Sequence, residues 1–467
     1  MSRKEKVILN DILIEGVAAE GNAIAHVDGK VLFVPQCIPG DIVDVRVLRK
    51  RKGYMEGQAV NLVKPSADRL DPFCRHYGEC GGCKWQPLPY PMQLKYKQQQ
   101  VADQLTRIGH LSLPEISPIL GSEQTEYYRN KLEFTFSNKR WIHKGEDPDS
   151  LSGNDWLALG FHISGFFDKV LDIEECHLQA EPSNAVRLFI KSYAIEHNLS
   201  FFDLREQSGF LRNMIVRTTS GGGTMLIVVF AYEDRKLRED LLNAVLVRFP
   251  EITSLYYVIN GKKNDSISDL PCRKFAGNDT ITERMENIEF KIGPKSFYQT
   301  NSRQAYRLYC VVRDFARLSG NEVVYDLYTG IGTIGLFLSA SAKKIVGIEY
   351  VKEAIEDARA NAAHNGITNS VFYAADMKDI LTPGFIAENG RPDLVILDPP
   401  RAGIHPDVAK VLLETAPDRM VYVSCNPASQ ARDLAILSEK YRITAVQPVD
   451  MFPHTHHVEN VVALEKI

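Results

Sequence analysis

One cysteine and two carboxylates lie at the ends of strand-forming segments in the last third of the sequence. Cys425 ends the apolar run of "RMVYVSCNP", Asp398 ends that of "LVILDPPRAG", and Glu459 opens the last one, in "HTHHVENVVALEKI". Ligands in open parallel sheets bind beyond the carboxyl ends of the strands, so these side chains are expected to share one crevice. Taken alone, Cys425 suits a small buried side chain better than a nucleophile, because free cysteines are commonly buried.

A glycine loop in the same region predicts a cofactor that contains a nucleoside. The segment "DLYTGIGTIG" spaces Gly330, Gly332 and Gly335 as G-x-G-x-x-G between an expected strand and an expected helix. Glycines allow a tight turn and let a ligand approach the backbone and the helix N-terminus closely. Several dinucleotide sites share this loop, so it leaves both NAD and S-adenosylmethionine open.

Three acids around the loop bear on the choice between NAD and S-adenosylmethionine. Glu349 ends "KKIVGIEY" after the loop and suits the two hydroxyls of a ribose in either cofactor. Asp326 directly precedes the loop, where an anion disfavours a pyrophosphate but suits a cationic sulfonium and its amino-acid end. Asp376 ends the third strand, near the expected place of an adenine. The alternative is that these acids cap helices or turns.

A cysteine and a carboxylate beside a methyl donor indicate methylation of uracil at C5. That carbon is a poor nucleophile until a thiolate adds to C6 and turns the ring into an enolate. C5 can then attack the sulfonium methyl group, and a base must remove the C5 proton so that the cysteine can leave. The sequence therefore predicts that Cys425 has a usable thiolate fraction and that a carboxylate base lies near it.

Five motifs resemble those of the RNA uracil-5-methyltransferases. They are "SFYQTN", "DLYTGIGTIGLF", "LDPPRAG", "VYVSCNP" and "HHVE", in this order within 296–459. The resemblance implies that Cys425 is the nucleophile and that Glu459 is the base that takes the C5 proton. It also implies that the cofactor and active-site contacts include the glycine loop, Gln299, Tyr328, Glu349 and Asp398.

Four further cysteines have the spacing of a metal site. Cys74, Cys80 and Cys83 follow C-x5-C-x2-C in "CRHYGECGGCKWQ", and "LDIEECHL" supplies Cys176. Four thiolates suit a 4Fe-4S cluster or a tetrahedral zinc ion. In the resembled family the ribosomal-RNA type carries a 4Fe-4S cluster with this spacing and the transfer-RNA type lacks it, so a structural cluster is expected. The other cysteines are expected to be packing residues: Cys37, Cys272 and Cys310.

The loop "HTHH" offers a second possible metal site in His454, His456 and His457. The i, i+2, i+3 spacing on one short loop is poor for ligation. No metal is therefore expected at these histidines.

The first 64 residues resemble a TRAM domain, a small OB-like RNA-binding barrel, and their short strand-like runs and glycine turns fit one. Its basic run would neutralise phosphates while an aromatic ring stacks on a base, although such a run alone is usually a solvated hairpin. The expected RNA contacts here are Arg46, Arg49, Lys50, Arg51, Lys52 and Tyr54. In "EYYRNKLEF" the family resemblance places three more residues near the RNA and the active site: Arg129, Asn130 and Lys131.

Three segments of different pattern predict a multidomain protein. Residues 1–64 form the β-barrel, and 65–295 form an α+β central domain with the iron–sulfur loop. Residues 296–467 alternate helices with buried strands, as in an α/β Rossmann-like class I methyltransferase domain. A helix over about 91–110 belongs to the central segment and is a candidate to pack on the catalytic domain.

Bulk composition sets limits on the partners. The chain has 55 Lys and Arg against 59 Asp and Glu, a net charge of −4, so an RNA partner must use a local patch. No secretory signal and no apolar stretch of roughly 20 residues is visible, which predicts a cytoplasmic protein that does not bind membranes. No obligate protein partner is evident.

These observations favour a cytoplasmic enzyme that methylates C5 of a uridine in 23S rRNA. It would use S-adenosylmethionine and a covalent cysteine adduct to a flipped base. The nearest alternative is the same chemistry on transfer RNA. An NAD-linked oxidoreductase would leave Asp326, Cys425 and the barrel unexplained, and a non-catalytic RNA-binding iron–sulfur protein would make Cys425 dispensable.

Overall fold

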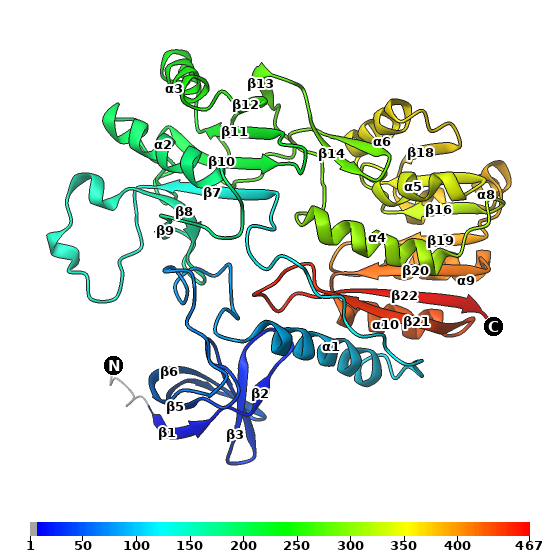
Figure 1. The fold of residues 1–467 in the computed structure, drawn as a ribbon, viewed down its shortest axis with the longest axis horizontal. Coiled ribbons are helices and arrows are strands. Elements are labelled where there is room, and N and C mark those ends of the chain that lie inside the picture. The colour runs from blue at the N-terminus through cyan, green and yellow to red at the C-terminus, as the bar shows by residue number, and fades with distance from the viewer. Residues whose placement is uncertain (1–6) are drawn as a thin grey trace.

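The N-terminal strands alternate buried and exposed side chains and curl into a small barrel in the computed structural model, which describes residues 7–467. Ala23, Ala25, Leu32, Val43 and Val45 point inward and form its core. The strands pair in the order β1-β5-β6-β4-β3-β2, and the barrel lies at the lower edge of the molecule in Figure 1. They are β1 (Ile8–Leu13), β2 (Gly16–Val17), β3 (Ala23–Val27), β4 (Lys30–Val34), β5 (Ile42–Lys50) and β6 (Tyr54–Lys64).

The middle of the chain forms a seven-stranded sheet whose central strands are buried on both faces. Its order is β13-β12-β11-β10-β7-β8-β9, and the β11–β12 pair is parallel while the others are antiparallel. Leu226 and Val228 pack in the core that α2 and α3 cover, whereas Met225 and Ile227 face the core of the C-terminal domain. This two-sided burial explains the unbroken apolar run "MLIVVF".

The elements of this central region are β7 (Lys131–Ser137), η1 (Pro148–Ser150), η2 (Gly153–Trp156), β8 (Ala158–His162), β9 (Val170–Asp172), α2 (Ser183–Glu196), β10 (Leu211–Thr218), β11 (Thr224–Phe230), α3 (Arg235–Arg248), β12 (Ser254–Ile259), β13 (Arg273–Gly277), β14 (Ile281–Met285) and β15 (Ile288–Ile292). The hairpin β14–β15 packs on α6, where the N–H of Lys291 donates to Asn361 Oδ1 at 2.7 Å. The apolar core therefore continues across residue 295.

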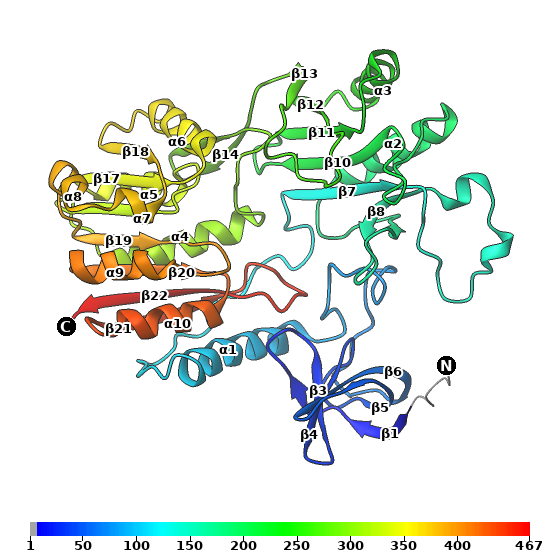
Figure 2. The ribbon, with the colours of Figure 1, turned by 180° about the vertical axis from the view of Figure 1, so that it is seen from behind.

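The last third forms a second seven-stranded sheet, in the order β18-β17-β16-β19-β20-β22-β21. β18 to β20 run parallel, and β22 is antiparallel to both of its neighbours. Helices α4, α5 and α6 pack on one face, and α7 to α10 pack on the other (Figures 1 and 2). The mostly parallel, doubly wound sheet predicted from the sequence is confirmed.

Its elements are α4 (Ser302–Ala316), β16 (Val323–Leu327), α5 (Thr333–Leu338), η3 (Ser339–Ser341), β17 (Lys344–Glu349), α6 (Lys352–His364), β18 (Ser370–Ala374), α7 (Met377–Ile380), α8 (Pro383–Asn389), β19 (Leu394–Leu397), α9 (Pro406–Thr415), β20 (Arg419–Ser424), α10 (Pro427–Leu437), β21 (Tyr441–Val449) and β22 (Glu459–Lys466). Among residues 7–467, no helix combines the length and the apolarity of a membrane span.

Helix α1 (Tyr90–Arg107) belongs to the central segment in sequence but lies along the C-terminal domain (Figures 1 and 2). Val101 and Leu105 are fully buried in the same core as α10. The chain after α1 then follows β21, where Leu120 forms a parallel bridge with Val449. An early part of the sequence thus completes one wall of the C-terminal domain.

Candidate active site

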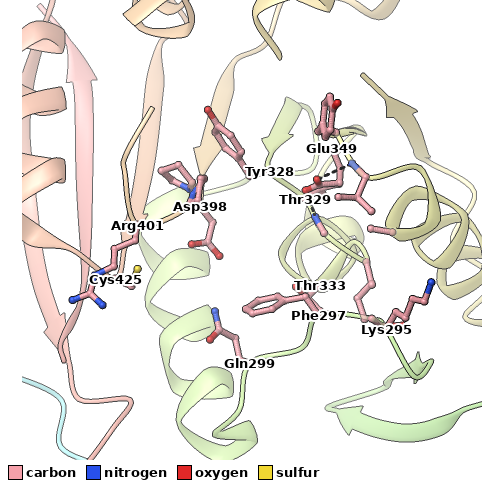
Figure 3. A pocket seen from close by; sticks show the side chains of 18 of the residues that line it. Lys295, Phe297, Gln299, Tyr328, Thr329, Thr333, Glu349, Asp398, Arg401 and Cys425 are labelled. Atoms are coloured by element: carbon pink, nitrogen blue, oxygen red, sulfur yellow. Dashed lines mark hydrogen bonds between the residues drawn. The ribbon is translucent and has the colours of Figure 1, made fainter. Parts of the chain in front are cut away.

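The carboxyl ends of the parallel strands open into one cavity of about 1370 Å³, which the central sheet closes from the other side. Figure 3 shows Glu349 and the glycine loop at one end of this cavity, and Asp398 and Cys425 toward the other. Because β22 runs antiparallel to β20, its first residue, Glu459, lies at the sheet edge where β20 ends before Cys425. We call this space the catalytic cavity.

Asp326, near the end of β16, is buried and holds the glycine loop in place. Its Oδ2 accepts hydrogen bonds from the Thr329 hydroxyl at 2.5 Å and from the Gly335 N–H at 2.9 Å. A Cβ at position 335 would lie 2.9 Å from that oxygen, so glycine is required there. The other oxygen, Oδ1, is buried without a partner, and burial raises the pKa of Asp326 to about 6. An orphaned carboxylate oxygen in this cavity suits a cationic ligand group.

The loop itself has backbone angles that bring its amides toward the cavity. Gly330 and Gly332 have φ angles of 56° and 83°, and Tyr328 has the left-handed value of 64°, which is rare for a bulky side chain. Such strain tends to collect at ligand sites. Glu349 Oε2 accepts from the Gly330 N–H at 3.3 Å, and its Oε1 accepts from the Val351 N–H at 3.0 Å.

Asp376 lines the catalytic cavity but also caps a helix. Its side chain accepts from the Lys378 N–H at 3.2 Å at the start of α7 and pairs with the Lys378 ammonium at 3.3 Å. The capping alternative therefore holds for Asp376, which is the N-cap residue of α7.

Gln299 enters the cavity from the segment before α4, opposite Asp398 (Figure 3). The Asn130 amide holds it by donating to the Gln299 carbonyl and to the Ser302 hydroxyl, each at 2.8 Å. Arg217, buried in β10, fixes the same segment by donating to the Ser296 carbonyl at 2.5 Å. Asn130, which the sequence places near RNA, thus acts in the structure as a positioning residue for Gln299.

Asp398, Cys425 and Glu459 lie where two carboxyls and a thiol perturb one another. Burial, with Asp398 beside it, raises the pKa of Glu459 to about 8, and burial raises that of Asp398 to about 7. Burial and these two carboxyls raise the pKa of Cys425 to about 11, while Arg401 opposes the rise. These groups oppose ionisation of the thiol, so the thiolate fraction predicted for Cys425 depends on Arg401 and on the protonation of the two carboxyls.

Arg401 was not singled out from the sequence, and His457 was considered there only as a possible metal ligand. Arg401 belongs to "LDPPRAG", and its carbonyl accepts from the Asn426 amide and the Ser429 hydroxyl, each at 3.0 Å, which joins the two motifs. His457 belongs to "HHVE", and burial lowers the pKa of its ring to about 4. Both lie inside the family motifs, which is the signal that would have found them.

Side chains of α1 hold the loop before Glu459 in place through buried polar contacts. The Lys97 ammonium and Asp450 Oδ1 form a fully buried ion pair at 2.5 Å, and the Tyr90 hydroxyl donates to Asp450 Oδ2 at 2.8 Å. The Gln93 side chain accepts from the His454 N–H at 2.8 Å. The histidine loop thus has a structural role here, and within residues 7–467 no set of three His, Cys, Asp or Glu side chains is arranged to hold a metal ion.

The four cysteines predicted to bind metal line one separate cavity of about 210 Å³, here called the cysteine cavity. The Gly82 N–H points at Cys80 Sγ at 3.5 Å, and burial raises the pKa of the Cys80 thiol to about 11. In the described chain no three of them lie close enough for a single metal ion, so the sulfurs surround a space instead of a point. The cavity is lined by Cys74, Cys80, Cys83 and Cys176, with apolar residues between them.

The basic residues predicted to bind RNA fall in two places. One group lies at the exposed end of β5 and on the turn that follows it, outside the lining of the catalytic cavity, and consists of Arg49, Lys50, Arg51 and Lys52. Arg129 lines both cavities and packs over the Phe452 ring at 5.4 Å, and Lys131 lines the catalytic cavity.

The strand order, with its antiparallel β22 and a glycine loop after β16, defines the class I methyltransferase fold. Residues 385–467 match the family model described as tRNA (Uracil-5-)-methyltransferase, and residues 10–60 match the TRAM domain. An uncharacterized RNA methyltransferase of Bacteroides thetaiotaomicron is 58% identical over 96% of this chain and 100% of that protein. Another uncharacterized RNA methyltransferase, of Porphyromonas gingivalis, is 57% identical over 97% of this chain and 98% of that protein.

Among solved structures, a Pyrococcus abyssi tRNA (uracil-54, C5)-methyltransferase in complex with S-adenosyl-L-homocysteine matches with a TM-score of 0.75 and 28% identity, over 98% of this chain and 100% of that one. The chain belongs to the RNA uracil-5-methyltransferase family and carries an N-terminal TRAM domain. Family membership decides against the NAD-linked oxidoreductase considered from the glycine loop.

Proposed function

We propose that this protein transfers a methyl group from S-adenosylmethionine to C5 of a uridine in 23S rRNA. The observation that carries the proposal is that Cys425, Glu459 and Asp398 share one cavity with the glycine loop. S-adenosylmethionine would supply an electrophilic methyl group on a sulfonium. The orphaned Asp326 Oδ1 fits its ammonium group, and Glu349 fits its ribose hydroxyls.

The reaction starts at the Cys425 sulfur. The thiol loses its proton to solvent, the thiolate bonds to C6 of the uracil, and the C5=C6 electrons pass to O4 as an enolate. These electrons return through C5 to bond the methyl carbon as the bond from that carbon to the sulfonium sulfur breaks, which would leave S-adenosylhomocysteine. Glu459 then takes the proton from C5, the electrons restore the C5=C6 bond, and the bond from C6 to sulfur breaks.

The pKa values of the carboxyls assign them different parts. Glu459, with a pKa raised to about 8, is a stronger base than an exposed carboxylate and suits removal of a carbon-bound proton. Asp398, with a pKa raised to about 7, carries a proton in part of the molecules near neutral pH and can donate it to the enolate oxygen. Arg401 is the cation beside the thiol and favours its ionised form.

The observation that supports a 4Fe-4S cluster is that four thiols line one cavity of about 210 Å³. The choice of a cluster over a zinc ion rests on the family pattern of this cysteine spacing. The cluster's part would be structural, because it would join the loop of Cys74 to Cys83 with Cys176 of the central sheet region. Iron and acid-labile sulfide analysis of anaerobically purified protein tests this.

The choice of 23S rRNA over transfer RNA rests on this cysteine set and on the family pattern in which it occurs with the ribosomal substrate. The likeness to a transfer-RNA enzyme over the whole chain favours transfer RNA as the second candidate. Unmodified 23S rRNA and transfer RNA transcripts should be incubated with the protein and S-adenosylmethionine, and 5-methyluridine mapped by mass spectrometry. Product in transfer RNA alone would establish the second candidate, and product in neither would refute both.

A further inference from the structure

The catalytic cavity is larger than one cofactor and one uracil require. Its volume of about 1370 Å³ exceeds the roughly 300–1,000 Å³ of typical small-molecule pockets. The glycine loop, Asp398, Cys425 and Glu459 occupy only the side made by the C-terminal domain. The remaining side is built by the central sheet and contributes no residue to the proposed reaction.

Two side chains of β7 face this remaining side. Lys131 and Glu133 are two residues apart on one strand, so both point to the same face, about 6.6 Å apart along the backbone. Between them, Leu132 points to the opposite face and is buried in the core of the central domain. A cation and an anion are therefore displayed next to each other toward the cavity.

Neither group is satisfied by the protein. Among the described residues, no hydrogen bond or ion pair links the Lys131 ammonium or the Glu133 carboxyl to another side chain, and only longer-range charges act on them. Lys131 is partly buried, which lowers the pKa of its ammonium, whereas the Glu133 side chain is exposed at the cavity. The partly desolvated ammonium favours a ligand acceptor, and the exposed carboxyl is open to the donors of the same ligand.

A third charge and apolar side chains lie next to the Lys131 and Glu133 pair. Arg217, paired in register with Lys131, adds a positive charge next to the ammonium, and its guanidinium is already engaged with the Ser296 carbonyl. Ile215, paired in register with Glu133, and Ile267 of the neighbouring loop supply apolar surface in the same part of the cavity. Charged groups beside apolar surface suit the edge and the face of a nucleobase.

We propose that Lys131 and Glu133 form a subsite that binds a guanine next to the target uridine in the RNA. Guanine presents an acceptor, O6, beside two adjacent donors, N1–H and N2–H, on its Watson–Crick edge. Lysine donates to O6, and a carboxylate accepts both N–H groups with its two oxygens. Adenine, cytosine and uracil each offer at most one donor group to the carboxylate. This inference rests on the proposed function, because it places the guanine relative to a methylated uridine.

The test uses the full-length protein and short RNAs with one central 5-fluorouridine and random flanking bases. Fluorine at C5 cannot leave as a proton, so RNA that reacts remains attached to the protein and fixes the register. Sequencing the attached RNA should show guanine enriched about tenfold at one fixed position beside the fluorouridine. The enrichment should disappear in Glu133→Gln and persist in the control Glu251→Gln, on the exposed turn after α3.

Two base analogues at that position separate the two side chains. Inosine lacks the N2 amino group, so replacing guanine by inosine should weaken binding several-fold for the native protein and not for Glu133→Gln. 6-Thioguanine keeps both N–H donors but replaces O6 with sulfur, a weaker acceptor, so the loss it causes should vanish in Lys131→Met. Absence of a guanine preference, or an equal preference in Glu133→Gln, would overturn the proposal.

Failure of the proposed function gives a different result. In that case no RNA becomes attached at all, and the reversibly bound RNA is sequenced instead. Guanine enrichment that depends on Glu133 in this fraction would keep the subsite while the methylation proposal falls. Enrichment that is absent, or independent of Glu133, would remove the subsite as well.

Discussion

The catalytic cavity and the cysteine cavity hold their reactive side chains in opposite ways. Asp398 and Glu459 face an open volume without a hydrogen bond from the described protein, beside the thiol of Cys425. In the cysteine cavity, backbone N–H groups point at the sulfurs, as that of Gly82 does at Cys80, and apolar residues enclose the space. Unpaired groups suit bonds that form and break, whereas enclosed and partly satisfied thiols suit a permanent ligand.

The largest effect is expected from removing the reactive thiol. Cys425→Ala should lower turnover by at least about 10³-fold, because no other side chain can form the bond to C6. Binding of S-adenosylhomocysteine, measured by calorimetry, should stay within about twofold of the native protein. Normal formation of 5-methyluridine by Cys425→Ala would remove the distinction between the two cavities.

Replacing the base should interrupt the reaction one step later. Glu459→Gln should lower turnover by about 10²- to 10⁴-fold, because proton removal from C5 is lost while the sulfur can still add to C6. A gel under denaturing conditions should show covalent RNA–protein adduct accumulating. Full activity without adduct would contradict the role of Glu459.

The same carboxyl predicts a pH dependence for the native enzyme. Glu459 acts as a base only when ionised, and its pKa is raised to about 8, so the single-turnover rate should rise as pH increases from about 6 to 8. Ionisation of Cys425, whose pKa is raised to about 11, acts in the same direction. Ionisation of Asp398, whose pKa is raised to about 7, removes the proton offered to the enolate oxygen and opposes this rise, so the profile is compared with that of Asp398→Asn. A rate that falls from about pH 6 to 8 in Asp398→Asn would contradict both assignments.

Breaking the buried ion pair between α1 and the loop before β22 should lower the stability of the folded protein. Lys97→Met leaves Asp450 charged and unpaired in the interior, which should cost about 3–5 kcal/mol. The double replacement Lys97→Met with Asp450→Leu should recover much of this, because no buried charge remains. Thermal unfolding followed by circular dichroism measures both, and equal melting of Lys97→Met and native protein would show that the pair contributes little.

The smallest effect on catalytic turnover is expected from replacing a thiol of the cysteine cavity. Cys83→Ser should lower the iron content and the melting temperature by about 5 °C or more, since a bound ligand stabilises the folded state. Cys37→Ser is the matched control, because Cys37 is another partly buried thiol but lies outside the cysteine cavity. Equal iron content in Cys83→Ser and Cys37→Ser would contradict the cluster proposal.

Much of the fold follows from local patterns in the sequence. Apolar strands and the glycine loop identify the doubly wound sheet, and the strand ends indicate where Asp398 and Cys425 lie. The insertion of β22 between β20 and β21 was not visible, because strand order depends on long-range pairing. That insertion is what brings Glu459 to the cavity.

The rest of the site depends on neighbours distant in sequence. The raised pKa of Cys425 arises from burial and from Glu459 and Asp398, and only the folded chain supplies all three. Asn130 resembles an RNA contact in sequence, but its amide holds Gln299, 169 residues away. Glu133 gave no signal in sequence, because only the assembled domains show that β7 faces the catalytic cavity.

The buried pair between α1 and the loop before β22 has a consequence for refolding. Lys97 and Asp450 are 353 residues apart, so closing this contact requires segments from both halves of the chain to be in place. Contacts of such long range form late, because the entropy of a long open loop must first be lost. Catalytic competence should therefore return only in the slowest refolding phase, after the separate sheets have regained their secondary structure.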